Sequence, residues 1–276
     1  MDQYVGRIID GRYRIVAPLA AGAMGSVFLA EQQHLHRQVA IKILTSDDKN
    51  MVERFRREAE ALSSVYHPAI IEVYDFVSPS VLDDDSYLVM SYVKGMDLED
   101  YKLSQPEHKL AVHEVVPLLL PVASALVELH ANGILHRDIK PANIVRFMRA
   151  DGRPGVKLVD FGIARRVEDP SITRGGKVMG SPPYLPPEVI RTRTHLPVSD
   201  VFSLGASLCE LVTGEPPFGR DDLARIVVRI LEQPVVLPPA IAHTALGTLL
   251  YAMLEKDPAA RPDALNVVRA LERLRS

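Results

Sequence analysis

The chain has 276 residues, of which 47% are apolar and 24% are charged, and its formal net charge at pH 7 is -3. This composition is typical of a globular protein, and the length suffices for one large domain or two small lobes. A slightly acidic chain is poorly suited to nucleic acid as its main partner, because a phosphate backbone requires a basic surface. A single cysteine, Cys209, excludes an intramolecular disulfide.

The sequence gives no sign of a targeting or membrane segment. The first residues, Met1-Asp2-Gln3-Tyr4, have neither the basic region nor the apolar core of a signal peptide. No apolar run approaches the roughly 20 residues that are needed to span a bilayer. We therefore expect a cytoplasmic chain without a membrane segment, while anchoring of a longer parent protein stays an open alternative.

The first third of the chain predicts a small sheet with one helix. Alternating and β-branched residues indicate strands at residues 13–17, 26–30, 38–44, 70–76 and 87–92. Residues 49–62 instead repeat apolar side chains at helical spacing. Small residues between the first two strands predict a hairpin with a tight turn.

Beyond Gly95 the pattern predicts helices, at residues 115–131, 200–213, 221–232, 242–255 and 263–275. The first of these ends at Asn132-Gly133, which is a typical C-terminal stop. Pro117 fits its first turn, whereas Pro121 is expected to kink or locally open the helix. Because the strands are bunched rather than alternating with helices, we expect an α+β fold without a parallel sheet.

Two short motifs carry the chemistry. The string His136-Arg137-Asp138-Ile139-Lys140-Pro141-Ala142-Asn143 matches the pattern H-R-D-x-x-x-x-N at every defined position, and Asp160-Phe161-Gly162 follows downstream. Together they supply a proton acceptor, a cation suited to phosphate and two oxygen ligands suited to Mg²⁺. On these residues the chain resembles the eukaryotic-type Ser/Thr protein kinases, and it looks most like their bacterial members.

The resemblance implies a bilobal fold. We expect a single kinase domain over residues 1–276, with a small antiparallel-sheet lobe at about 10–91, a hinge at about 91–95 and a larger helical lobe at about 96–276. It further implies an enzyme that uses ATP and Mg²⁺ to phosphorylate Ser/Thr hydroxyls of protein substrates. Autophosphorylation through a kinase dimer is expected by the same resemblance.

The resemblance also implies the catalytic roles. Asp138 would accept the substrate proton and Lys140 would neutralise the transferred phosphate, while Asn143 and Asp160 would hold Mg²⁺. Lys42, in the string Val39-Ala40-Ile41-Lys42, would hold the α- and β-phosphates and pair with a helix glutamate. The local match favours Glu58 for that glutamate, although periodicity does not exclude Glu60.

Nucleotide-binding residues follow from the glycine-rich turn and the strands around it. The family pattern G-x-G-x-x-G-x-V reads here with alanine at its first position, a departure that restricts the turn and is expected to weaken or slow nucleotide binding. The residues expected to contact the nucleotide are Leu19, Ala20, Ala21, Gly22, Ala23, Met24, Gly25, Ser26, Val27, Ala40, Lys42, Met90, Val93 and Val145.

The segment after Gly162 resembles an activation loop. It contains Ser171 and Thr173, and we expect Thr173, with Ser171 as second choice, to be autophosphorylated and to pair with Arg137. The alternative is that both are ordinary loop hydroxyls. Four further residues have structural roles by resemblance: Ser181 bonds to the catalytic groups, Asp200 holds the catalytic loop, and two residues form a buried ion pair, namely Glu188 and Arg261.

Two other functions remain open. A pseudokinase would keep the fold as a nucleotide-binding scaffold without transferring phosphate, and only Ala20 favours it. A small-molecule kinase would share the aspartate and metal chemistry but would act on free hydroxylated metabolites.

Overall fold

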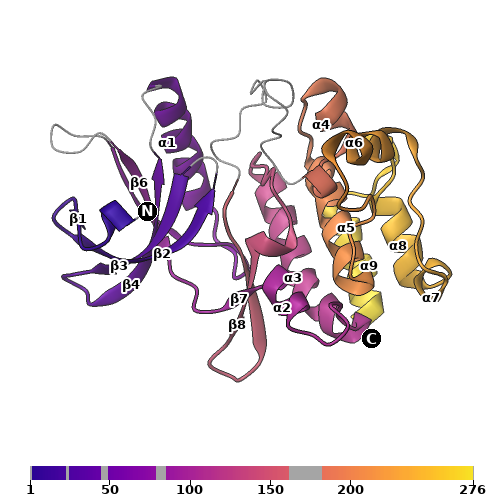
Figure 1. Cartoon of the computed structure of the whole chain (residues 1–276), viewed down its shortest axis with the longest axis horizontal. Coiled ribbons are helices and arrows are strands. Elements are labelled where there is room, and N and C mark those ends of the chain that lie inside the picture. The colour runs from indigo at the N-terminus through magenta and orange to yellow at the C-terminus, as the bar shows by residue number, and fades with distance from the viewer. Residues whose placement is uncertain (1, 23–24, 45–48, 79–84, 162–181, 276) are drawn as a thin grey trace. The chain divides into compact units, whose positions relative to one another are not determined.

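The computed structural model describes residues 2–22, 25–44, 49–78, 85–161 and 182–275 (Figure 1). The chain divides into two compact units. The smaller unit consists of Met1–Tyr66 and Ile71–Lys94, and the larger unit consists of His67–Ile70 and Gly95–Ser276. The smaller unit is built on an antiparallel sheet and the larger one mainly on helices, so the predicted α+β fold class is confirmed.

The smaller unit is a six-stranded antiparallel sheet with one helix. Its strands follow the order β1-β2-β3-β4-β6-β5. Their bounds are Ile8–Ile9 for β1, Tyr13–Gly22 for β2, Gly25–Gln32 for β3, Arg37–Leu44 for β4, Val73–Val77 for β5 and Ser86–Ser91 for β6; the helix is α1, Lys49–Ser63, and Asp2–Tyr4 forms the 3-10 turn η1. All the predicted strands are present, but the one expected from residue 70 begins at Val73.

Burial explains the apolar residues of these strands, since β4 and β6 are buried along most of their length. Phe28, Ile41 and Val89 are fully buried, and they belong to one hydrophobic core together with Tyr4 and Ile9. On α1 the apolar residues Phe55, Ala59 and Leu62 are buried at helical spacing. The Phe55 ring meets the Phe76 ring of β5 with centroids 5.6 Å apart, which fixes α1 against the sheet.

Glycine is required at position 25, where β3 begins. Gly25 pairs with Gly22 across the first hairpin and has a φ of 137°. A Cβ at this position would lie 2.0 Å from the carbonyl oxygen of Ile43 on β4. Any other residue would therefore push the hairpin away from the next strand.

The larger unit combines helices with a small antiparallel sheet of order β7-β8-β9. Its strands are Met96–Asp97 (β7), Ile144–Met148 (β8) and Pro154–Leu158 (β9). Its helices are Leu98–Leu103 (α2), Val112–Ala131 (α3), Pro187–Thr192 (α4), Pro197–Thr213 (α5), Leu223–Glu232 (α6), Pro239–Ala242 (α7), Ala245–Met253 (α8) and Ala264–Arg275 (α9), with 3-10 turns at Pro141–Asn143 (η2), Pro182–Tyr184 (η4) and Pro258–Ala260 (η5). All five helices predicted beyond Gly95 are present, whereas the short elements were not predicted.

Helix α3 is long and apolar, and it packs against α9 and α5 within the larger unit. It begins at Val112, so Pro117 lies beyond the first turn that the sequence assigned to it, and the helix continues through Pro121. By length and composition it could cross a membrane, so the expectation that the chain has no membrane segment is not confirmed. However, 56% of its most apolar window is buried inside the unit, as expected of a core helix.

Candidate functional site

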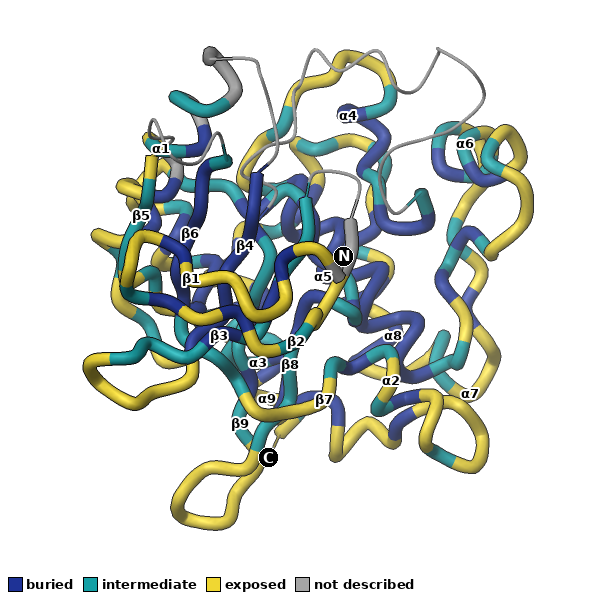
Figure 2. Tube along the Cα trace, turned by 60° about the vertical axis from the view of Figure 1, so that its left-hand side comes forward, coloured by how far each residue is buried: buried dark blue, intermediate teal, exposed yellow. Residues whose placement is uncertain are grey.

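Helix α5 is almost wholly buried (Figure 2). A stripe of polar residues nevertheless runs along it. Asp200, Ser203, Ser207 and Glu210 follow one another at intervals of three, four and three residues. This spacing places them on one face of a helix. The stripe is what holds the loop of residues 136–143 and the turn η4.

Asp200 begins the stripe and holds the start of the loop of residues 136–143. Its two carboxylate oxygens accept the backbone N–H groups of His136 and Arg137, each at 2.9 Å, and Nε2 of His130 donates to it at 3.0 Å. Burial alone would raise the pKa of Asp200, but the bond from His130 and the neighbouring imidazoles outweigh it and keep this pKa below its usual value. Asp200 is therefore the charged anchor that the sequence predicts.

The anchored loop has an unusual backbone and a fixed imidazole. Arg137 has a φ of 67°, a conformation that costs energy for a residue with a side chain. Nε2 of His136 lies 3.1 Å from the carbonyl oxygen of Val159, and Nδ1 accepts the N–H of Asp138 at 3.3 Å. Because the carbonyl can only accept and the N–H can only donate, the proton resides on Nε2. Burial lowers the pKa of His136, consistent with this neutral tautomer.

Asp138, Lys140 and Asn143 form one polar group. The amide nitrogen of Asn143 donates to Oδ2 of Asp138 at 3.0 Å and to its backbone oxygen at 2.7 Å, and Nζ of Lys140 lies 3.2 Å from the same Oδ2. Asp138 and Asn143 are buried. A carboxylate with an ammonium and an amide nitrogen beside it is held in one orientation.

The strand β9 brings Asp160 next to this group. The N–H of Val159 donates to the carbonyl oxygen of Asn143 at 2.9 Å, so Asp160 follows directly on a residue that is bonded to the loop. Asp160 has a φ of 52°. The ring of Phe161 is buried and packs on the His136 ring with centroids 4.5 Å apart. The two sequence motifs therefore lie together in the larger unit.

Glu188 and Arg261 form the buried ion pair that the sequence predicts. The guanidinium binds both carboxylate oxygens, each at 2.7 Å, and Ser199 donates its hydroxyl to Glu188 at 2.6 Å. Burial tends to raise the pKa of Glu188, but the bonds from Arg261 and Ser199 keep it below its ordinary value. Arg261 also donates to the backbone oxygens of Val198 and Glu255, so it joins α4, α5 and the segment before η5.

The predicted nucleotide residues of the smaller unit share one face of its sheet. Residues opposite each other in antiparallel strands point to the same side, as do residues two apart in one strand. Ala40 and Lys42 are two apart on β4, and their partners are Met90 for Ala40 and Val27 for Lys42. Ala20 in turn lies opposite Val27. The Lys42 side chain is mostly buried, with 8% exposure.

Ala20 is a strand residue here and not part of the turn itself. It lies within β2 and is not among the described residues with positive φ. A glycine at this position would therefore bring no conformation that alanine cannot adopt. The sequence-based expectation that Ala20 restricts the turn is not supported by its backbone.

The remaining predicted residues are more scattered or lie outside the description. Leu19 is exposed on β2, Ser26 follows Gly25 on β3, Val93 follows β6, and Val145 lies on β8 opposite Lys157 in the larger unit. Glu58 is on α1 and Ala21 is on β2, but their side chains are not described, and Gly22 ends β2 opposite Gly25. Positions outside the described residues are Ala23, Met24, Ser171, Thr173 and Ser181.

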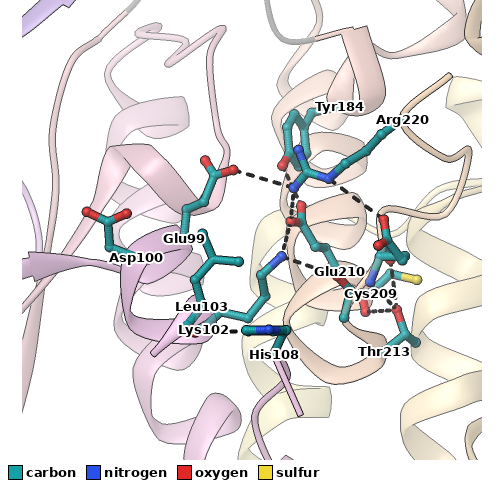
Figure 3. Close-up of polar contacts among 12 residues, drawn as sticks. Glu99, Asp100, Lys102, Leu103, His108, Tyr184, Cys209, Glu210, Thr213 and Arg220 are labelled. Carbon is teal, nitrogen blue, oxygen red and sulfur yellow. Dashed lines mark hydrogen bonds and ion pairs between the residues drawn. The ribbon is translucent and has the colours of Figure 1, made fainter. Parts of the chain in front are cut away.

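Sequence reasoning missed a buried ionic cluster at the end of the polar stripe (Figure 3). Glu210, fully buried on α5, accepts from Nζ of Lys102 at 2.5 Å, from the hydroxyl of Tyr184 and from the guanidinium of Arg220. Burial, followed by the nearby carboxylate, raises the pKa of Tyr184, so its hydroxyl stays a donor. The available signal was the helical spacing of Glu210 from Asp200; nothing in the sequence indicates Lys102.

Comparisons with known proteins agree with these motifs. A family model described as protein kinase domain matches residues 13–271. Serine/threonine-protein kinase PrkC of Bacillus subtilis is 40% identical over 232 residues, which cover 83% of this chain and 34% of that protein. Serine/threonine-protein kinase PknB of Mycolicibacterium smegmatis is 38% identical over 262 residues, covering 92% of this chain and 41% of that protein, and pkn3 of Myxococcus xanthus is 36% identical over 281 residues, covering 98% and 51%.

A comparison of the fold with solved structures also finds a kinase domain. The crystal structure of a double mutant of the Mycobacterium tuberculosis PknI kinase domain matches with a TM-score of 0.75 and 26% sequence identity, and the match covers 98% of both chains. By contrast, the chain spans only about a third to a half of the length of the three curated relatives named above.

Proposed function

Because the chain belongs to the protein kinase domain family, we propose that it transfers the γ-phosphate of ATP to serine or threonine hydroxyls of protein substrates. The observation that carries this proposal is the polar group of Asp138, Lys140 and Asn143 on a loop anchored by Asp200. Phosphoryl transfer asks a protein mainly for alignment and for neutralisation of charge, and this loop offers both.

Asp138 is the proposed base. The bonds from Asn143 and Lys140 orient its carboxylate, and a substrate hydroxyl placed against it would be aligned for attack as its proton is withdrawn. Lys140 is 21% exposed, so its ammonium can also reach a phosphate oxygen and neutralise it during transfer.

Asn143 and Asp160 fit the requirements of Mg²⁺. The amide nitrogen of Asn143 is committed to Asp138, which leaves its amide oxygen as the ligand atom, and Asp160 offers a carboxylate. Mg²⁺ prefers such hard oxygen donors and takes only one or two of them from a protein, together with phosphate and water oxygens. When bound, the ion would neutralise charge on the phosphates of ATP.

The sheet face of the smaller unit is proposed to bind the nucleotide. The side chains of Val27 and Ala40 would cover the adenine, with Met90 and Ala20 beside them on the same face, and Lys42 on that face would hold the α- and β-phosphates. Glu58 is the proposed partner of Lys42. Leu19 would add to this cover, and Val93 completes the proposed adenine surroundings within the smaller unit.

Autophosphorylation within a kinase dimer belongs to the same proposal. Thr173, with Ser171 as second choice, is the proposed acceptor, and its phosphate would pair with Arg137. The proposal rests on the family resemblance and on the position of Arg137 directly before Asp138, since the acceptor hydroxyls lie outside the described residues.

A transfer assay tests the proposed function. The chain is incubated with γ-labelled ATP, Mg²⁺ and a generic basic protein, and the products are separated and mapped by mass spectrometry. We expect label on serine and threonine of the protein and on Thr173 or Ser171, and a loss of at least about 100-fold in Asp138→Asn. The matched control is Asp151→Asn, which removes an exposed carboxylate of the β8–β9 hairpin and should leave the transfer rate unchanged.

Each contrary result has a definite meaning. Nucleotide binding without transfer would make the chain a pseudokinase, and label found only on free hydroxylated metabolites would make it a small-molecule kinase. Equal rates for Asp138→Asn and wild type would show that Asp138 is not the base.

A further inference from the structure

The cluster around Glu210 brings together segments that are far apart in the sequence. Lys102 on α2 lies 108 residues before Glu210, Tyr184 ends the turn η4, and Arg220 lies between α5 and α6 (Figure 3). Lys102 is 2% exposed, and its ammonium also donates to the carbonyl oxygen of Gly214 at the end of α5, at 3.2 Å. One carboxylate thus receives three donors from three parts of the larger unit.

Stability alone gives a weak account of this cluster. Removing both a lysine and a glutamate from water costs several kcal/mol per ion, and their mutual attraction often does no more than offset that cost. An apolar pair of similar volume would serve a purely structural purpose as well. The arrangement is better explained by what it holds in place.

What it holds is Tyr184. The hydroxyl of Tyr184 donates to Glu210, and its backbone oxygen accepts the hydroxyl of Ser203 at 2.8 Å. Both contacts come from α5, from residues seven positions apart and therefore on one face. The turn η4 is thus attached to the helix at two points, through the side chain and through the backbone of one residue.

The same helix face also positions the catalytic loop. Asp200 holds the N–H groups of His136 and Arg137, three residues before Ser203. Tyr184, Leu185 and Pro186 line a small cavity together with Arg137 and Asp138. The position of the turn relative to Asp138 is therefore set by one helix, and the turn borders the cavity that Asp138 lines, where a protein substrate using Asp138 as its base would bind.

Arg220 is the exposed member of the cluster. Its side chain is 44% exposed, and besides Glu210 it reaches Glu99 on α2 at 3.4 Å and Glu215 at 3.7 Å. A planar guanidinium with several donors can serve all three carboxylates at once, which an ammonium cannot do equally well. Without Arg220, Glu210 would keep only Lys102 and Tyr184 as side-chain donors among the described residues.

We propose that Lys102 and Arg220 are positioning residues for the protein substrate: they hold the Glu210 carboxylate so that it fixes Tyr184, and through Tyr184 the turn beside Asp138. The inference rests on the proposed kinase function. It places their effect on the binding of the protein substrate and not on the binding of ATP, because none of the four side chains belongs to the proposed nucleotide site.

Steady-state kinetics of the whole chain test this proposal. KM for ATP and KM for two protein substrates, one basic and one acidic such as casein, are compared for wild type, Arg220→Ala, Arg220→Lys and Tyr184→Phe. We expect Arg220→Ala and Tyr184→Phe to raise KM for both proteins by about tenfold and to leave KM for ATP within about twofold. Arg220→Lys should show a smaller rise in KM for the proteins than Arg220→Ala. Guanidinium ion at low millimolar concentration should partly restore the protein KM of Arg220→Ala.

The control is Arg225→Ala, which removes an exposed arginine of the same region that pairs with Asp222 at 3.1 Å, so both KM values should stay unchanged. Tyr184→Phe keeps the ring and removes only the hydroxyl. Its KM values therefore test the proposal even if Arg220→Ala folds poorly.

Three outcomes would overturn the proposal. A lower melting temperature with unchanged KM values would make the cluster purely structural. Equal changes in KM for ATP and for protein would show that the effect does not run through the turn. If Arg220→Ala lowered KM for the basic protein alone, the role of Arg220 would be to neutralise nearby carboxylates and not to position the turn. Absence of any transfer by wild type would instead refute the proposed function itself.

Discussion

His136 owes its neutral state to its surroundings. The ring is fully buried and packs on the Phe161 ring. Its Nε2–H donates to the carbonyl oxygen of Val159, and its Nδ1 accepts the N–H of Asp138. Protonation of Nδ1 would break the bond from Asp138 and place a charge in the core. Asp200, only one hydrogen bond away, is buried as deeply but stays charged because three N–H groups point at it. The difference between the two lies in their donors and acceptors.

Acid should therefore destabilise the larger unit through His136. The pKa of the folded-state imidazole lies below its ordinary value of 6.5, so the unfolded chain binds the proton more readily. The contribution to stability is complete above about pH 6.5 and is lost as pH falls below it. We expect the melting temperature to fall between pH 7 and pH 5, and to fall less steeply in His136→Phe.

Two further variants keep this measurement specific. Burial also lowers the pKa of His67. His67→Phe should therefore also make the melting temperature fall less steeply between pH 7 and pH 5, independently of His136. The exposed His243 is the control, since His243→Gln should leave the slope as in wild type. Equal slopes for His136→Phe and wild type would show that this imidazole does not titrate on unfolding.

Residue roles could be predicted where the motif itself names both partners. Glu188 with Arg261, and Asp200 with the loop of residues 136–143, were predicted from the family resemblance, and both contacts are present. The contact of Lys102 with Glu210 could not be predicted. Each residue is unremarkable in its own segment, and only the packing of α2 against α5 brings them together.

At the scale of elements, length and periodicity decided what the sequence could predict. Helices such as α3 and α5 repeat apolar residues over many turns, and they were predicted to within a few residues. Helix α2 has only six residues, although Asp97 caps it by accepting the N–H of Asp100 at 2.9 Å, a signal that could have been recognised. Strands β8 and β9 were not predicted: each has only five residues, and β9 begins with a proline and a glycine, which are poor strand formers.

The joint between α4 and α5 should depend on the Glu188–Arg261 pair. Arg261→Met leaves a buried carboxylate with Ser199 as its remaining side-chain partner among the described residues, and it removes the bonds to Val198 and Glu255. We expect the free energy of unfolding of the larger unit to fall by about 3–5 kcal/mol. Urea unfolding followed by circular dichroism measures it.

A double-mutant cycle identifies the cause of that loss. Glu188→Met combined with Arg261→Met removes both charges, and the pair should cost clearly less than the sum of the single variants. The matched surface pair is Asp222 with Arg225, for which the same cycle should give no more than about 1 kcal/mol. Additive losses at Glu188 and Arg261 would mean that the two residues do not act as a pair.

For the whole molecule, the order of elements indicated two parts before any motif was considered. Bunched strands followed by helices predicted a sheet-based part and a helical part, and the structure has both. The assignment of His67–Ile70 to the larger unit could not be predicted, because it depends on contacts distant in sequence. The N–H of Leu158 donates to Ala69 at 2.7 Å, and Nε2 of His67 lies 3.2 Å from the hydroxyl of Ser124.

Since each unit has a core of its own, a defect in one should appear in that unit first. Gly25→Ala would force a methyl group to within 2.0 Å of the Ile43 carbonyl oxygen, at a φ of 137°. Gly11→Ala is the matched control in the same unit, because Gly11 also has a positive φ, 63°, but no atom lies within 4 Å of the place that its methyl group would take. Hydrogen exchange followed by mass spectrometry should show faster exchange in β2, β3 and β4 for Gly25→Ala, and much less change for Gly11→Ala. Helices α3 and α5 should keep their protection in both variants; an equal loss in these helices would mean that the two units unfold as one.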